Sequence, residues 1–196
     1  MFKYYIAYKP FQTLCQFSPS QNKKNLKDYF AVARDVYPVG RLDYDSEGLL
    51  ILSNDPFVNN RLLNPTYRHE REYWVQVEGD IDEETLQKLK SGVLISVDGK
   101  PYHTQPCKAA RLANNIKVHD RIPPIRIRKN IPTSWISLIL TEGKNRQVRR
   151  MTATVGHPTL RLIRTRIEKL TLEEMQPGDL IEIPHVKFYR LLFDIR

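Results

Sequence analysis

Hydrophobic and polar residues alternate over several short stretches of the chain, and this period of two is typical of strands that are buried on one face. Residues 4–9 show it, and so do residues 70–79, where Tyr73 falls on the same face as two valines. The aliphatic run at 49–52 is bounded by turn residues and predicts a fully buried strand. Further strands are expected at residues 93–97, 107–112, 134–140, 159–172, 180–183 and 188–193.

Apolar residues at helical spacing, flanked by residues that favour helix ends, predict three or four helices. Asn25 and Asp55 are suited to cap helix N-termini, and Gly92 is suited to end a helix. The helices are expected at residues 25–32, 57–63, 82–92 and 145–155. Because these helices are dispersed among many strands and most connectors are short, the pattern favours an α+β fold with a mixed, largely antiparallel central sheet flanked by helices.

The chain has 196 residues, of which 41% are hydrophobic, so it can bury a core as one domain or as two small halves that share one. Its formal net charge of +9 favours a polyanionic partner, either nucleic acid or an anionic membrane surface. No apolar run approaches the roughly 20 residues that a membrane-spanning helix needs. We therefore expect nucleic acid as the partner and no membrane, although a merely basic housekeeping protein would carry the same charge.

The cysteines and histidines give no sign of a metal site or of a disulfide framework. Cys15 and Cys107 lack the spacing of a zinc site, and His103, His119 and His157 form no cluster in the sequence. The first residues are interrupted by lysines and lack the apolar core of a signal peptide. We therefore expect no metal and a location in the reducing cytoplasm.

An acidic loop before the strand at 49–52 holds the most distinctive chemistry. Asp43, Asp45 and Glu47 alternate in this loop, which is bounded by glycines. A solvated acidic turn is the commonest use of such a loop. A calcium loop is disfavoured, because Asn54 stands where a bidentate glutamate is needed and the flanks are strands rather than helices. The third interpretation is a catalytic carboxylate that acts on a polyanion and is held in place by the strand that follows.

A basic segment, residues 144–151, is expected to lie on a helix. Arg146 and Arg150 are four residues apart and share one face, while Arg149 lies beside the apolar stripe. A partly buried arginine needs a carboxylate partner, and Asp43 is the natural candidate. Each of these arginines taken alone would more often belong to a solvated helix face.

Three other features each leave two interpretations open. Tyr73, in the middle of a strand, either packs in a core or stacks on a base. The basic, proline-rich connector at 122–132 is either a surface loop or an arm that lies on phosphates. The arginines of residues 159–172 alternate with aliphatic residues, which gives that strand a basic face.

Three motifs resemble those of the pseudouridine synthases, in the branch typified by the small-subunit ribosomal RNA enzyme. They are residues 40–50, with the sequence GRLDYDSEGLL, residues 142–151, with EGKNRQVRRM, and residues 157–164, with HPTLRLIR. The motifs occur in the order of the family and span most of the chain. Residues 123–126 and 131–135 are most similar to one member of the branch that acts on large-subunit ribosomal RNA.

The resemblance implies one catalytic domain over residues 1–196, with two subdomains that share one sheet and an active-site cleft between them. Many relatives carry a small S4 RNA-binding domain ahead of the catalytic one. The resemblance implies that this chain has none, because it begins with the first catalytic strand. One departure is local: relatives usually have a glycine-containing turn after Lys9-Pro10, where this chain has Phe11-Gln12-Thr13.

The family's residue roles can be carried over to matching positions. The resemblance makes Asp43 the catalytic aspartate, Arg149 the basic residue that pairs with it, and Tyr73 the tyrosine that packs on the target base. It implies large-subunit ribosomal RNA as the partner and neither a cofactor nor a metal, and we expect a monomer. The residues expected to hold RNA phosphates are Arg41, Lys144, Arg146, Arg150, Arg161 and Arg164.

Two functions from other classes would use the same residues. A non-catalytic RNA-binding or ribosome-assembly protein needs only the basic surface. A metal-dependent nuclease could use Asp43, Asp45 and Glu47 as Mg²⁺ ligands.

Overall fold

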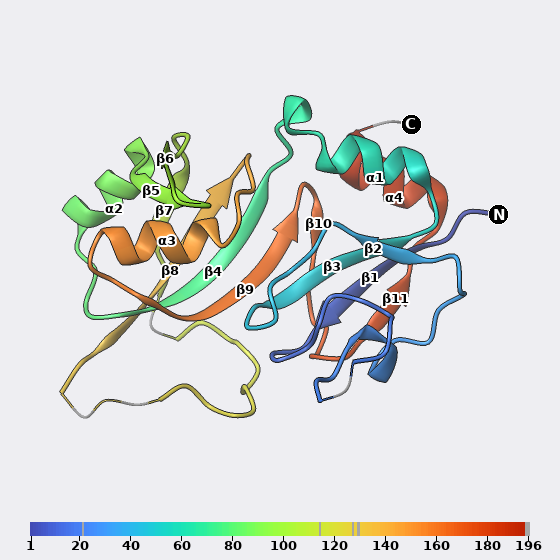
Figure 1. Ribbon diagram of the computed structural model, residues 1–196, viewed down its shortest axis with the longest axis horizontal. Coiled ribbons are helices and arrows are strands. Elements are labelled where there is room, and N and C mark those ends of the chain that lie inside the picture. The colour runs from blue at the N-terminus through green and yellow to red at the C-terminus, as the bar shows by residue number, and fades with distance from the viewer. Residues whose placement is uncertain (21, 114, 127, 129, 195–196) are drawn as a thin grey trace. The chain divides into compact units, whose positions relative to one another are not determined.

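The computed structural model describes residues 1–20, 22–113, 115–126, 128 and 130–194 (Figure 1). Two compact units divide the chain. Unit 1 comprises Met1–His69 and Arg164–Arg196, and unit 2 comprises Glu70–Ile163. Strand β9, Thr159–Ile167, crosses the boundary, so its first half belongs to unit 2 and its second half to unit 1.

The sheet of unit 1 is built around strand β1, Tyr4–Lys9, which pairs antiparallel with β3, Glu47–Ser53, and with β11, Leu180–Glu182. Every residue of β3 is buried, as its aliphatic sequence predicted. Two short strands complete the sheet: β2, Tyr37–Val39, pairs with β3, and β10, Leu170–Thr171, folds back on β9.

Two short helical segments and two α-helices belong to unit 1 among the described residues. The prediction of a helix at 57–63 is confirmed by α1, Pro56–Leu63. The side chain of Asp55 caps this helix, since it accepts a hydrogen bond from the Phe57 amide at 2.9 Å. The other elements are the 3₁₀ turns η1, Leu26–Asp28, and η2, Pro65–Tyr67, and the α-helix α4, His185–Phe193.

The helix expected at 25–32 is only one turn long. Asn25 caps it as predicted, since its side chain accepts from the Lys27 amide at 2.9 Å, and the Asp28 carboxylate accepts from the Asn25 amide at 2.8 Å. After this turn, Phe30 enters the core of unit 1 and is 2% exposed. The two capping hydrogen bonds therefore close one turn, but whether the helix extends beyond that turn depends on packing in the core.

The expectation of a strand at 188–193 is wrong, because this segment belongs to helix α4. Phe188 and Leu192 are four residues apart and both are buried, whereas the residues between them are more exposed. Aromatic residues favour strands in general, but here the ring of Phe188 packs on that of Tyr4, with centroids 4.7 Å apart. Tertiary packing on one face has overridden local preference.

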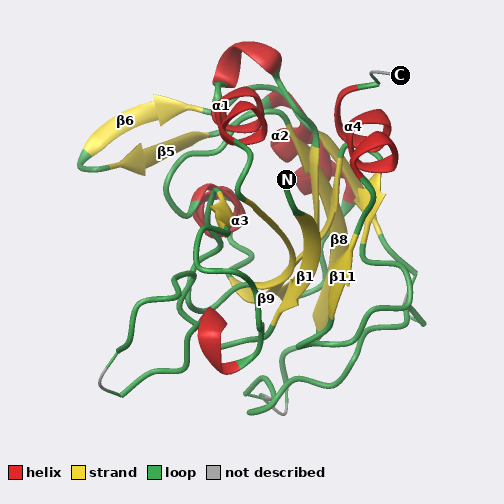
Figure 2. Cartoon of the chain, turned by 90° about the vertical axis from the view of Figure 1, so that its right-hand side faces the viewer, coloured by secondary structure: helices red, strands yellow, loops and turns green. Residues whose placement is uncertain are grey.

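The sheet of unit 2 is centred on strand β8, Thr133–Leu140, which pairs antiparallel with β4, Arg71–Glu78, over its whole length and with β7, Lys108–Arg111. Strands β5, Leu94–Val97, and β6, Lys100–His103, form a separate two-stranded sheet, which Figure 2 shows as a ribbon of its own. Neither β6 nor the short β2 of unit 1 was predicted from the sequence.

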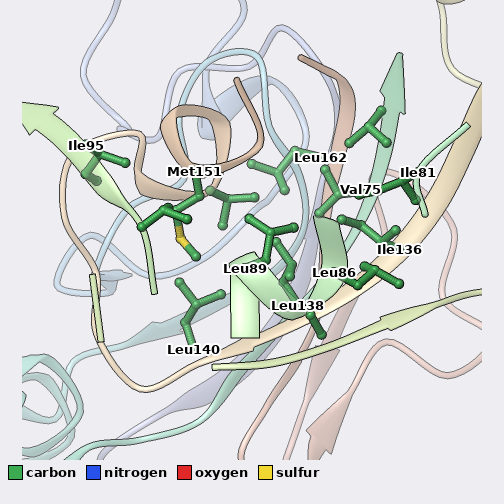
Figure 3. Packing of buried hydrophobic residues seen from close by; sticks show 14 residues of the cluster. Val75, Ile81, Leu86, Leu89, Ile95, Ile136, Leu138, Leu140, Met151 and Leu162 are labelled. Atoms are coloured by element: carbon green, nitrogen blue, oxygen red, sulfur yellow. The ribbon is translucent and has the colours of Figure 1, made fainter. Parts of the chain in front are cut away.

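Two helices, α2, Glu83–Ser91, and α3, Gln147–Thr154, enclose the core of unit 2 (Figure 3). Leu89 from α2 and Met151 from α3 are fully buried together with Leu138 from β8. The α+β prediction, with largely antiparallel pairing and flanking helices, is confirmed. Within the described part of the chain, no helix has the length and apolar character to cross a membrane.

The core of unit 2 offers a test of this packing. Leu138→Ala removes a fully buried side chain, so we expect the free energy of unfolding to fall by about 2–5 kcal/mol. Leu94→Ala makes the same change at a residue that is 59% exposed and should change it by less than about 0.5 kcal/mol. Urea denaturation of both variants measures the difference, and equal effects would contradict the described core.

Candidate active site

Asp43 lies in unit 1, in the loop that joins β2 to β3, and its side chain is half-buried. The amide of Ser46 donates to the carbonyl oxygen of Asp43 at 3.1 Å and closes a turn. Gly48 has φ +107, and a Cβ there would lie 2.3 Å from the carbonyl oxygen of Arg164 on β9. Only glycine fits this close approach, so the motif glycine fixes where the acidic loop joins the sheet.

A buried lysine lies beneath this acidic loop. Lys9, the last residue of β1, is 0% exposed, and its ammonium donates to the carbonyl oxygens of Ser46 at 2.8 Å and of Pro10 at 3.0 Å. Burial lowers the pKa of Lys9 to about 8, while Cys15 and the acidic side chains of the loop, Asp43 among them, act in the opposite direction. The lysine thus holds the turn that carries Asp43 and sets positive charge next to it.

Lys9 was not among the predicted site residues, although the sequence carries a signal for it. A lysine that ends an apolar strand, in a chain with three carboxylates in one loop, is a candidate for a buried counter-charge. The solvated-turn interpretation accounts poorly for this arrangement. Glu47 is 2% exposed and belongs to β3, so the loop is only partly open to water.

The calcium and magnesium interpretations gain no support from the described residues, in which no group of three or more His, Cys, Asp or Glu side chains could hold a metal ion. Glu47 is the first residue of a buried strand. Its place in the strand gives it a structural setting of its own, apart from Asp43 and Asp45.

The basic segment of unit 2 is held at its start by Glu142. This buried carboxylate accepts from the Gln105 amide at 2.8 Å, from Gln147 Nε2 at 2.5 Å and from the hydroxyl of Tyr102. The ammonium of Lys144 lies 4.8 Å from the centre of the Tyr102 ring. Glu142 therefore ties the loop between β8 and α3 to β6 and to the segment after it.

The four basic side chains of this segment differ in how exposed they are. Lys144 and Arg146 are exposed, and Arg146 begins the helix with φ +50. Arg149 is half-buried, as expected from its position beside the apolar stripe. Arg150 is less open than expected, because it is half-buried and donates to the carbonyl oxygen of Ser96 on β5.

Tyr73 lies on β4 opposite Leu138 of β8 and packs against the core of unit 2, yet it is only partly buried. Both interpretations of this tyrosine therefore stay open. Asp43 belongs to unit 1, whereas Arg149 and Tyr73 belong to unit 2, so the pairing of Asp43 with Arg149 stays a prediction.

The three remaining arginines differ in exposure. Arg41 is exposed beside Asp43. Arg161 and Arg164 are each 5% exposed and donate to carbonyl oxygens, of His119 at 2.7 Å and of Leu49 at 2.8 Å respectively. The basic face expected on β9 is therefore turned inward at these two positions. RNA contact through Arg161 and Arg164 stays a prediction, and their burial counts against it.

The pKa of Lys9 gives a pH-dependent prediction. Because the folded-state pKa is depressed, the folded chain releases this proton at lower pH than the unfolded chain does, and this term makes stability rise with pH. We expect the difference in unfolding free energy, wild type minus Lys9→Met, to rise by up to about 3 kcal/mol between about pH 7.5 and about pH 10.

Lys3→Met is the control for this measurement. The hydrogen bond and charge of Glu182 raise the pKa of Lys3, so its contribution is present at neutral pH and is lost at high pH. Urea denaturation from about pH 7.5 to about pH 10 should thus give a nearly constant difference for Lys3→Met, because a raised pKa acts only above the ordinary value, and a rising difference for Lys9→Met. A flat profile for Lys9→Met would mean that Lys9 keeps an ordinary pKa.

Comparison with known proteins matches residues 3–154 to the family model described as RNA pseudouridylate synthase. A ribosomal large subunit pseudouridine synthase E of Vibrio parahaemolyticus serotype O3:K6 is 45% identical over 181 residues, which is 92% of this chain and 74% of that protein. One of the same name from Xanthomonas campestris pv. campestris is 46% identical over 87% of this chain and 89% of that protein. A ribosomal large subunit pseudouridine synthase B of Bacillus subtilis is 36% identical over 97% of this chain and 72% of that protein.

A solved structure described as a pseudouridylate synthase has the same fold. It covers 98% of this chain and 74% of its own, with a TM-score of 0.79 and 22% sequence identity. These matches confirm the resemblance that the three motifs indicated. The chain belongs to the RNA pseudouridylate synthase family.

Proposed function

We propose that this protein isomerises a specific uridine of large-subunit (23S) ribosomal RNA to pseudouridine, with Asp43 as its catalytic carboxylate and without a cofactor. The observation that carries the proposal is the setting of Asp43, in a turn fixed by the buried ammonium of Lys9 and by the close approach at Gly48. The relatives named ribosomal large subunit pseudouridine synthase E, at 45% and 46% identity, support the choice of RNA.

The reaction needs one well-placed carboxylate. The C1′–N1 glycosidic bond breaks, the detached uracil turns, C5 bonds to C1′, the proton on C5 leaves and N1 takes a proton. Asp43 would either attack C1′ or remove a neighbouring sugar proton to give a glycal, and in either route it must be ionised. Atoms and electrons balance within the nucleotide, so neither an oxidant nor an energy source enters.

The two units would work together as one catalytic domain over residues 1–196, sharing one sheet, with the active-site cleft between them. The guanidinium of Arg149 would hold the Asp43 carboxylate by a forked pair of hydrogen bonds. A paired or stacked uridine must be turned out to expose C1′, and Tyr73, whose ring is partly exposed, would replace the lost stacking. Arg41, Lys144, Arg146 and Arg150 would hold the flanking phosphates.

The setting follows from the substrate. The ribosomal RNA named for the relatives supports a cytoplasmic location. We infer a monomer that uses no metal, since one carboxylate, one guanidinium and one aromatic ring suffice for the steps above.

Asp43→Asn should abolish pseudouridine formation while folding and RNA binding are retained, because the amide is almost the same size but cannot act as a nucleophile or base. The assay is release of tritium from 5-tritiated uridine in a large-subunit ribosomal RNA transcript, with and without EDTA. Asp45→Asn is the matched control and should retain activity. Turnover by Asp43→Asn would remove Asp43 from the mechanism, and RNA cleavage stopped by EDTA would indicate a nuclease instead.

Arg149→Ala should lose activity and also about 1–3 kcal/mol of stability, because its carboxylate partner would be left partly buried without its fork. Arg149→Lys keeps the charge but not the planar fork and should recover only part of both. Tritium release and urea denaturation measure the two effects, with Arg190→Ala, an exposed arginine of α4, as control. Normal activity and stability of Arg149→Ala would refute the pairing.

A further inference from the structure

Three lysines of unit 1 carry positive charge that the fold does not neutralise. Lys23, Lys24 and Lys27, which we call the lysine loop, are all exposed, and none forms an ion pair with any residue that the structure describes. Five lysines elsewhere in the chain differ in this respect, because their ammonium groups lie 2.6–2.8 Å from a carboxylate oxygen: Lys3, Lys88, Lys90, Lys108 and Lys169.

The backbone that carries these lysines is fixed in place. The Leu14 amide donates to the carbonyl oxygen of Lys24 at 2.8 Å, and the Leu26 amide donates to that of Gln16 at 3.0 Å. Leu26 is completely buried between two of the lysines, and the capping box at Asn25 closes the turn. The loop therefore presents its charges from a defined base, which reduces the entropy lost when a ligand binds.

The lysine loop lies next to the loop that carries Asp43. The ammonium of Lys23 lies 4.9 Å from the centre of the Tyr44 ring, and Tyr44 directly follows Asp43. At the base, the Sγ of Cys15 lies 4.0 Å from the carbonyl oxygen of Gly40, which precedes the same acidic loop. All three lysines line an open hollow of about 660 Å³ on the surface of unit 1.

We propose that the lysine loop binds the phosphates of the RNA strand that carries the target uridine to Asp43. The inference rests on the proposed function and adds a substrate-holding element that the family motifs do not contain. A polyanion fits best, because three unpaired ammonium groups line one hollow, and that of Lys23 lies over Tyr44 in an acidic loop that would otherwise repel phosphates. Lysine binds phosphate as a point charge without reading sequence, so these contacts would position the strand rather than select the base.

The test compares two triple variants that each lower the formal net charge of the chain, which is +9, by three. One is Lys23→Ala/Lys24→Ala/Lys27→Ala. The matched control is Arg34→Ala/Lys187→Ala/Arg190→Ala, which changes three exposed basic residues elsewhere in unit 1 that form no ion pair with any described residue. Tritium release from a large-subunit ribosomal RNA transcript gives kcat and KM at several salt concentrations.

The lysine-loop variant should raise KM at least about tenfold with kcat almost unchanged, because contacts to phosphates, whose bonds do not change in the reaction, act equally in the ground state and the transition state. Loss of three phosphate contacts reduces the steepness of the plot of log affinity against log salt concentration by about 2–3. Raising salt from about 50 to about 200 mM should therefore cost the wild type about 20- to 40-fold more affinity than the variant. The control variant should follow the wild type closely.

Each outcome separates the lysine loop from the proposed function. Wild type that releases no tritium would refute the proposed function itself. Active wild type with equal KM and equal salt dependence in both triple variants would overturn the lysine loop alone. Normal activity of the lysine-loop variant on the transcript, but not on assembling ribosomal particles, would indicate an acidic protein partner and would also overturn RNA binding.

Discussion

The candidate site depends on the burial of one ammonium group beneath three carboxylates. Lys9 is fully buried, and taking an unpaired charge out of water raises the free energy of the folded state. Hydrogen bonds and nearby opposite charge must offset this increase. The fold supplies both, with the carbonyl oxygens of Ser46 and Pro10 and with the acidic side chains above. With a pKa of about 8, the charged form still exceeds the neutral form about tenfold at pH 7.

This lysine also connects the acidic loop to the sheet. In the register of β1 with β3, Lys9 lies opposite Gly48, the residue whose missing side chain lets β3 approach Arg164. Any side chain at Gly48 would collide with the backbone of Arg164, so only glycine allows β3 to lie this close to β9. The loop that carries Asp43 is therefore joined to the sheet at a tight strand contact next to one buried cation.

The elements that could be predicted from the sequence are those whose local signals agree with their packing. The run at 49–52 is aliphatic throughout and forms a buried strand, and Asp55 caps α1 as its position indicated. Helix α4 could not be predicted, because its aromatic residues favour strands locally and only packing against Tyr4 decides the matter.

The site was harder to predict than the fold, because sequence gives the number of cations but not their exposure. Arg161 and Arg164 were predicted to give the strand a basic face and are buried on carbonyl oxygens, whereas Lys23 was not among the predicted site residues and is exposed. Lys9 looked like the end of a strand. In each case the deciding quantity is whether water or a carbonyl oxygen surrounds the cation, and that depends on residues far away in the sequence.

The distribution of charge around Asp43 explains how a carboxylate can work on a polyanion. Phosphates approaching the acidic loop are repelled, and this repulsion extends over about 8 Å at physiological ionic strength. The net charge of +9 attracts RNA from a distance but cannot remove that local barrier. Cations near the loop reduce this repulsion: Lys9 is bonded to the Ser46 carbonyl oxygen, Arg41 lies two residues before Asp43, and the Lys23 ammonium lies 4.9 Å from the centre of the Tyr44 ring. In the mechanism that we propose, Arg41 and Lys23 would hold the flanking phosphates while the carboxylate meets the ribose.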